Sequence, residues 1–246
     1  PLDHDLCAAV ADLTGSLTPT ERCWALLRLV TLAGVLIAGV VLFWVLPLGL
    51  TALAVLTLSG VAYSLLLIAT HEMVHGTLLG WRRMETPLAC LLSWPMAWPH
   101  LTYARLHRFH HRWNGLDARD PERTDVLPIE HLRAGPLRRW VHRHWLLWRC
   151  VVLAGVGLIL DTAQKGKQLQ RVDPLLARCQ QLDGLGVTLV QAAMLRVAIA
   201  HHQLWRYVLL WLVLERVIGA IIQCRALIEH HGLWHSEATP LLTQLY

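Results

Sequence analysis

The chain has 246 residues, of which 55% are hydrophobic and only 16% are charged, and its mean hydropathy is +0.43. A water-soluble domain of this length rarely has so apolar a composition, so the sequence predicts an integral membrane protein. The net charge of +5 comes mostly from arginines in one segment, which favours a role in loop orientation over nucleic-acid binding. The six cysteines include no CxxC pair, which argues against a disulfide framework or a zinc knuckle.

Two apolar runs come first along the chain. They cover residues 29–46 and 48–70, with Pro47 between them. Each approaches the ~20 residues that a helix needs to cross about 30 Å of hydrocarbon. We therefore expect a transmembrane hairpin that returns the chain to its starting side just before His71. Residues 77–99 are less apolar and contain three prolines, which is typical of an interfacial or re-entrant segment.

The next segment, residues 100–144, is polar and contains nine arginines. The positive-inside rule predicts that this segment is cytoplasmic. Residues 145–160 form a third apolar run, and we expect this run to cross the membrane.

A polar connection is expected over residues 161–186, because it contains Pro174 and Gly184, and a long fourth apolar run follows over residues 187–223. If both last runs cross, His230 returns to the side that holds the arginine-rich segment. The predicted fold class is all-α. We expect a single polytopic membrane domain over residues 1–246, with about four transmembrane helices and a histidine-rich cap that faces the cytoplasm.

Fifteen histidines are the main anomaly of the composition, and several stand at helical spacing beside the expected membrane surface. Residues at i and i+4, or at i, i+3 and i+4, project from one face of a helix, so such imidazoles can hold one metal ion together. The candidate metal ligands are His71, His75, His107, His110, His111, His230 and His231. So many histidines exceed the four ligands of one tetrahedral zinc and fit two metal ions.

Three carboxylates stand next to these histidines in the sequence. They are Glu72, Asp120 and Glu229. A carboxylate that accepts the second N–H of a metal-bound imidazole fixes the tautomer and orientation of the ring, and we expect this role for all three.

Four segments resemble the membrane-bound fatty acid desaturase and hydroxylase superfamily, whose members are di-iron enzymes with histidine boxes. HEMVHG at 71–76 resembles the first box and HRFHH at 107–111 the second. NGLDARDPER at 114–123 resembles the Asp-Pro-rich tail of the second box, and RALIEH at 225–230 resembles a segment that supplies a further ligand. The third box, another HxxHH, is absent before Tyr246, and we expect the sequence to be truncated there.

This resemblance implies an oxidoreductase of lipid metabolism that uses two iron ions and dioxygen to desaturate or hydroxylate a lipid acyl chain. The implied partners are a membrane lipid or acyl substrate, dioxygen and an external electron donor of ferredoxin or cytochrome type. An external donor is needed because no flavin, haem or iron–sulfur motif is visible. No catalytic residue is assigned beyond the metal ligands. A carotenoid hydroxylase or ketolase of the same superfamily is an alternative.

A second alternative is an intramembrane zinc metalloprotease. Residues 71–75 match HExxH, in which two histidines bind zinc and Glu72 would act as general base. Such proteases take a third ligand from a later aspartate, and Asp183 in Leu-Asp-Gly offers one. The expected topology places Asp183 on the membrane side opposite His71, and a protease leaves HRFHH unexplained. The sequence therefore favours the desaturase-like interpretation.

A non-enzymatic alternative is a metal transporter or haem-binding protein that uses ionisable residues inside the bundle, namely His201, His202 and Glu215. We expect the two histidines to lie instead at a polar end between helical segments. Glu215 and Arg216 are adjacent and so project about 100° apart on a helix, which predicts that they do not pair. Either of them is a candidate for lining a substrate channel.

Overall fold

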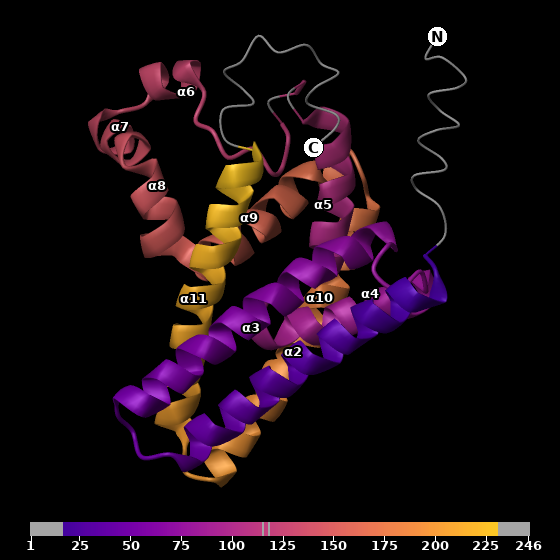
Figure 1. Ribbon diagram of the computed structural model, residues 1–246. Helices are drawn as coiled ribbons and strands as arrows, with labels where there is room; N and C mark the ends of the chain where they lie inside the picture. The colour runs from indigo at the N-terminus through magenta and orange to yellow at the C-terminus, as the bar shows by residue number, and fades with distance from the viewer. Residues whose placement is uncertain (1–16, 115, 118, 231–246) are drawn as a thin grey trace.

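Figure 1 shows the computed structural model, which describes residues 17–114, 116–117 and 119–230. Within these ranges the regular structure is helical, and no strand occurs. Five of the helical stretches are long and apolar enough to cross a membrane: Pro19–Val45, Leu50–His75, Trp145–Arg171, Leu175–Ala200 and Leu204–His230. The predicted all-α membrane architecture is confirmed, with five candidate spans in the described part where about four were expected.

The expected N-terminal hairpin is formed by α2 (Pro19–Val45) and α3 (Leu50–His75). A capping box starts α2, because Thr18 accepts a hydrogen bond from the Glu21 amide (3.3 Å) and Glu21 accepts one from the Thr18 amide (2.7 Å). Gly76 ends α3 in the left-handed conformation (φ 71°), which glycine adopts without steric cost. The turn at Gly76 thus ends α3 directly after His71 and His75.

Three short elements follow the hairpin: α4 (Arg82–Ser93), the 3₁₀ turn η1 (Trp94–Met96) and α5 (His100–Trp113). With 12 residues, α4 is too short to cross the membrane, which agrees with the expected interfacial or re-entrant segment. The Tyr63 hydroxyl of α3 donates to the Leu92 carbonyl (2.7 Å) and so anchors α4 to the hairpin.

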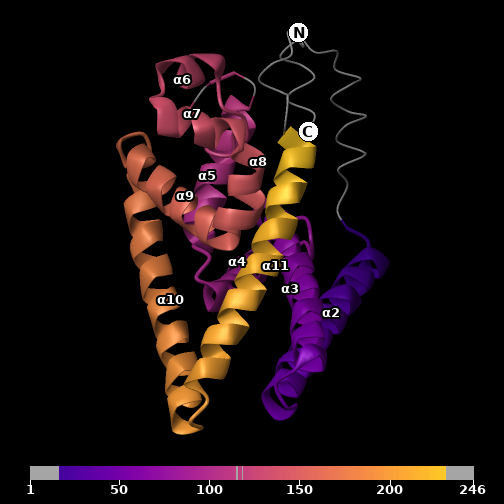
Figure 2. The same cartoon turned by 90° about the vertical axis from the view of Figure 1, so that its left-hand side faces the viewer.

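The third apolar run does not form one straight span. After α6 (Pro128–Arg133) and α7 (Pro136–Arg143), the chain continues through α8 (Trp145–Leu147), the π-helix η2 (Trp148–Leu153) and α9 (Ala154–Gln168). Ala154 has φ 41°, a conformation in which no helix continues. The chain reverses there, and α9 runs back toward the end at which α8 begins (Figures 1 and 2). The apolar run over residues 145–160 is therefore interrupted at Ala154 and does not form the single continuous helix that was expected.

The reversal leaves backbone amides and carbonyls without helical hydrogen bonds. Side chains of α11 (Leu204–His230) bind these groups. Glu215 accepts from the Val156 amide (2.6 Å), the Arg216 guanidinium donates to the Val151 and Val152 carbonyls (2.8 Å each), and Gln223 donates to the Ala154 carbonyl (3.3 Å). Irregular backbone at membrane depth is tolerated only where protein groups satisfy it. We call Glu215, Arg216 and Gln223 the brace.

The brace corrects one expectation. Arg216 donates to the Glu215 carboxylate through both Nε and Nη2. Adjacent residues on a helix pair here because the long arginine side chain bends back toward its neighbour. Their shared target is the open backbone of the bent segment, so the two charges serve the fold.

A second hairpin is formed by α10 (Leu175–Ala200) and α11. The expectation of a polar connection over residues 161–186 is wrong, because α9 extends to Gln168 and α10 begins at Leu175. Gly184 lies within α10 at an exposed position, where it leaves the helix intact. His201 and His202 lie exposed in the turn between α10 and α11, as expected for a polar helix end, so they do not face the bundle interior.

Figure 2 shows how the hairpins orient the polar elements. The α2–α3 and α10–α11 turns lie at one end of the molecule, and α5, α6 and α7 lie at the other. The apolar core holds this arrangement together through side chains of α2, α3 and α11, among them Phe43, Leu56, Leu66 and Leu214. As a result the C-terminal ends of α3 and α11 point toward the histidine-rich helix α5.

Candidate metal centre

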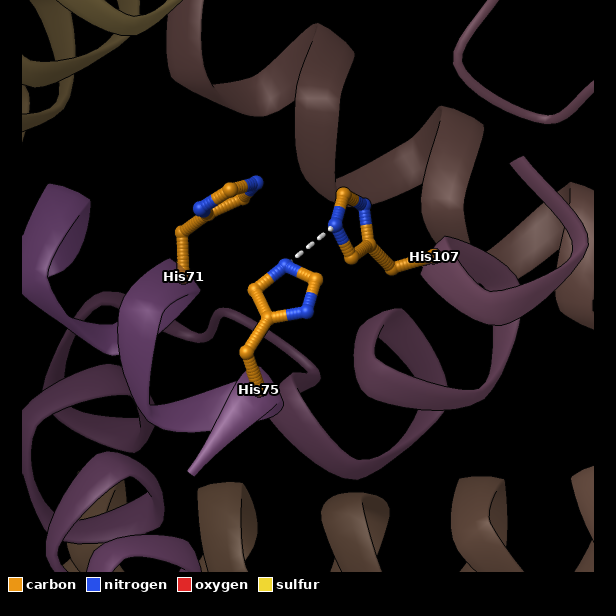
Figure 3. A group of neighbouring side chains, drawn as sticks. All are labelled: His71, His75 and His107. Carbon is orange, nitrogen blue, oxygen red and sulfur yellow. Dashed lines mark hydrogen bonds between the residues drawn. The ribbon is translucent and has the colours of Figure 1, made fainter. Parts of the chain in front are cut away.

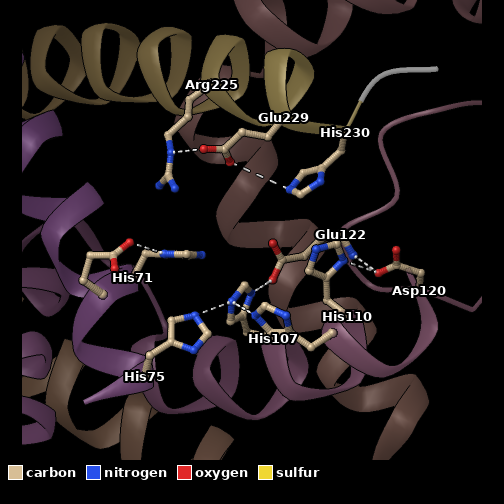
Figure 4. A network of polar contacts seen from close by, with 11 residues as sticks. His71, His75, His107, His110, Asp120, Glu122, Arg225, Glu229 and His230 are labelled. Carbon is tan, nitrogen blue, oxygen red and sulfur yellow. Dashed lines mark hydrogen bonds and ion pairs between the residues drawn. The ribbon is translucent and has the colours of Figure 1, made fainter. Parts of the chain in front are cut away.

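Three elements bring the candidate ligands to one place: the last turn of α3, the middle and end of α5, and the last residue of α11 (Figure 4). The predicted ligands that meet there are His71, His75, His107, His110, His111 and His230. His231 lies outside the described residues. Histidines up to 159 positions apart in the sequence (230 − 71 = 159) thus share one site.

The first set of ligands, the α3–α5 group, consists of His71, His75 and His107 (Figure 3). One ligand nitrogen of each lies within 4.8 Å of the others. The Nε2 atoms of His75 and His107 are 3.1 Å apart, and the Nε2 atom of His111 lies 2.9 Å from that of His107. Four imidazoles from two helices therefore direct nitrogens at a common point.

The second set, the α5–α11 group, consists of His110, Glu122 and His230. Their ligand atoms also lie within 4.8 Å of one another, and the His110 and His230 ring centroids are 4.7 Å apart. Glu122 connects the two groups, because its Oε1 lies 2.5 Å from Nδ1 of His107. The two groups are therefore neighbours that share a carboxylate contact.

Carboxylates hold one ring nitrogen of three of these histidines. The Nδ1 atoms of His71, His107 and His110 face Glu72 (3.0 Å), Glu122 (2.5 Å) and Asp120 (2.9 Å), respectively. A carboxylate accepts, so in each pair Nδ1 carries the proton and Nε2 keeps its lone pair. This carboxylate–histidine arrangement is the one that orients metal-binding imidazoles. The expected roles of Glu72 and Asp120 agree with this geometry.

Sequence reasoning missed Glu122. It stands in the DPER segment that was associated with the second box, but only Asp120 was singled out there. Asp120 accepts a hydrogen bond from the Glu122 amide (2.9 Å), and such an Asx-type turn directs the following side chain. A second carboxylate two residues after Asp120 was the available signal.

The protonation states in α5 and its following loop suit a cation site. Burial, together with the charges of His107 and His75, lowers the pKa of His111 to about 4, so this ring is neutral and able to bind metal at pH 7. Burial alone would raise the pKa of Glu122, but its contact with His107 and the nearby His110 and His230 lower it to about 2. Glu122 is therefore ionised, and it brings a negative charge to the histidines.

Glu229 does not have the expected role. Its carboxylate binds Arg225 (2.7 Å), and its nearest approach to Nε2 of His230 is 3.8 Å, which exceeds hydrogen-bond distance. Within the described part of the chain, Nδ1 of His230 has no hydrogen-bond partner. Glu229 thus fixes Arg225 and leaves the His230 ring without a carboxylate to orient it.

The donor set fits two metal ions. Each group offers three ligand atoms, from imidazole nitrogens alone in one and from two imidazoles and a carboxylate in the other. Such nitrogen and oxygen donors suit iron, zinc and other first-row metals, so the ligand type does not identify the metal. A bound metal ion would take the place of the hydrogen bonds between imidazoles, such as the one between His75 and His107.

Asp183 does not join either group among the described residues. Its carboxylate accepts from the Leu101 amide (3.1 Å), the Thr102 amide (2.8 Å) and the Trp94 indole (3.0 Å), and it is 2% exposed. It therefore caps α5, the helix that carries His107, and its expected position on the membrane side opposite the histidines is wrong. The protease alternative loses its third ligand because all these donors occupy the carboxylate.

A family model described as fatty acid desaturase matches residues 48–244, which is most of the chain and includes both ligand groups. No curated protein and no solved structure matches the chain. The chain therefore belongs to the fatty acid desaturase family.

Proposed function

We propose that this protein is a membrane-bound oxidoreductase that uses two iron ions and dioxygen to desaturate or hydroxylate a lipid acyl chain. Membership of the desaturase family implies an oxidoreductase of the desaturase or hydroxylase type. The substrate, the two irons and the use of dioxygen are the further steps of the proposal. Its main support is the presence of two neighbouring ligand groups on α3, α5 and α11, each with three donors.

The chain's own residues would hold and orient such a centre. His71, His75 and His107 would bind one ion, and His110, Glu122 and His230 the other. Bound iron supplies the oxidising power needed to remove hydrogen from an unactivated C–H bond. Asp120 keeps the ring of His110 in the ligating tautomer, and Glu122 does the same for His107.

The site lies at the end of the molecule where the polar helices gather, next to the ends of two candidate membrane spans. We propose that this end faces the cytoplasm, because the arginine-rich segment that follows α5 lies there. An external ferredoxin or cytochrome would deliver electrons to this end. An acyl chain would approach the centre laterally from the lipid.

The proposal is tested with the purified full chain loaded with iron, a reduced ferredoxin as electron donor and a substrate mixture of phospholipids and free fatty acids. Mass spectrometry of the lipids is expected to show a product that is 2 Da lighter for desaturation or 16 Da heavier for hydroxylation. Formation of the product should require dioxygen. Iron-loaded protein that consumes neither dioxygen nor lipid, or product that forms without dioxygen, would contradict the proposal.

A further inference from the structure

A cavity of about 100 Å³ lies between the two ligand groups and the bent α8–α9 segment. Its wall includes His71 from the α3–α5 group and Glu122 and His230 from the α5–α11 group. Apolar side chains, among them Leu67 and Leu158, line the remainder together with several charged residues. A molecule that enters this cavity is therefore adjacent to the candidate metal centre.

Three cationic side chains line the cavity, and two of them are paired. Lys165 contacts Asp161 (2.6 Å), and Arg225 contacts Glu229 (2.7 Å). Arg149 differs, because no carboxylate in the described part of the chain lies within ion-pair distance of its guanidinium. One cation in the cavity thus has no internal counter-ion.

The orientation of Arg149 is nevertheless fixed. Its Nε donates to the Gln223 side-chain oxygen, and the Gln223 amide in turn donates to the Ala154 carbonyl (3.3 Å) at the helix break. Across the residues that the structure describes, no acceptor is hydrogen-bonded to either Nη atom of Arg149. Gln223 of the brace therefore fixes the guanidinium through Nε, and the two Nη atoms stay available for a ligand.

Two carboxylates that line the same cavity, Asp161 and Glu122, are engaged elsewhere. Asp161 is bound by Lys165, and Glu122 contacts His107. Neither of these two carboxylates accepts a hydrogen bond from Arg149.

A partly buried guanidinium whose Nη atoms meet no acceptor among the described residues is costly unless a further group pairs with it. The guanidinium fork matches a carboxylate, which it binds through two parallel hydrogen bonds. The rest of the cavity wall is largely apolar, with Leu67, Leu158 and Ile222 among its residues, so a carboxylate at the end of an apolar chain complements both the guanidinium and the wall. We propose that Arg149 binds the free carboxylate of a lipid acid; this inference rests on the proposed function of the site.

Two consequences follow for the substrate. It is a free acid, because an ester or thioester carries no negative charge at the carbonyl carbon. Since Arg149 and the candidate ligands line the same small cavity, the carbon that is oxidised lies only a few bonds from the carboxylate. The structure thus assigns both the form of the substrate and the region of the chain that reacts.

The test compares three small probes of equal chain length: hexanoate, methyl hexanoate and 1-hexanol. Isothermal titration calorimetry with the purified full chain in nanodiscs gives the Kd of each. Hexanoate is expected to bind at least about tenfold tighter than the two neutral probes. Arg149→Gln should abolish this preference, Arg149→Lys should keep part of it, and Arg196→Gln, at an exposed position on α10, should leave it unchanged.

Equal Kd values for the three probes, or an undiminished preference in Arg149→Gln, would overturn the inference. If Arg149→Gln does not fold, the probe series on the unmodified chain and on Arg149→Lys decides. Binding requires no turnover, so the two proposals fail separately. A preference for hexanoate in a chain that binds no iron would refute only the proposed function, whereas iron-dependent lipid oxidation without the preference would refute only the carboxylate site.

Discussion

Two clusters of polar side chains in this helix bundle, the brace and the histidine end, differ in what their polar groups face. In the brace, donors meet acceptors: Glu215 accepts from a backbone amide, and Arg216 donates to backbone carbonyls. At the histidine end, ring nitrogens face one another, because the Nε2 atoms of His75 and His111 both lie close to that of His107. The brace completes the fold, whereas several imidazole nitrogens that are directed at one point form a site that can hold a cation.

The largest effect is expected at the centre of the α3–α5 group. His107→Ala removes the ring that contacts both His75 and His111, together with the partner of Glu122. Iron content and lipid oxidation should fall at least ~100-fold, because the loss of a ligand exceeds the 10–100-fold effect of losing an outer carboxylate. Metal quantification of the purified protein checks this. His201→Ala, at an exposed turn, is the control and should retain its iron.

A substitution beside the brace is expected to lower the free energy of unfolding, in addition to any effect on metal binding. A Cβ atom on Gly219 would lie 1.8 Å from the Gly155 amide nitrogen, so α11 can pass the helix break only with glycine there. Gly219→Val is expected to destabilise the protein by about 3 kcal/mol through overpacking. Thermal unfolding of the purified protein measures this. Gly34→Val is the matched control, because nothing lies within 4 Å of that position.

Substitution of Glu122 is expected to have a smaller effect, and to change iron affinity instead of stability. Glu122→Gln keeps the shape of the side chain but removes the charge that faces His107, His110 and His230. Iron affinity is expected to fall about 10–100-fold, with a nearly unchanged unfolding temperature. Competition with a chelator measures the affinity. An unchanged iron affinity would show that Glu122 neither binds metal nor orients His107.

The smallest effect is expected for Arg216→Lys. Lysine keeps a cation beside the buried Glu215 carboxylate but loses guanidinium donors that the Val151 and Val152 carbonyls use. A cost of about 1 kcal/mol is expected, with iron content unchanged. Arg196→Lys on α10 serves as the reference in the same unfolding assay. A loss of iron in Arg216→Lys alone would mean that the brace and the ligand groups are not separate in function.

The sequence predicts the parts of this site that depend on helical spacing. His71 and His75, and likewise the three histidines of HRFHH, were expected to share faces of helices, and they do. Glu122 was missed because a loop positions it, through the hydrogen bond between its amide and Asp120. Spacing along a helix carries no information on such a turn.

The bent segment was also beyond sequence reasoning, for a related reason. The apolar run that begins at Trp145 has the composition of a span, and only the tertiary contacts of Glu215, Arg216 and Gln223 make its reversal at Ala154 possible. Gly184 was read as a helix breaker, yet α10 runs through it. A single glycine costs a helix only about 1 kcal/mol, which the packing of a long apolar helix overcomes.

Iron K-edge X-ray absorption, combined with metal quantification on the purified full chain, addresses the two ligand groups together. We expect about two iron ions per chain, with an inner shell of nitrogen and oxygen atoms and the outer scattering typical of imidazole. One zinc ion per chain without iron, or iron without imidazole scattering, would contradict the assignment of these histidines to a di-iron centre.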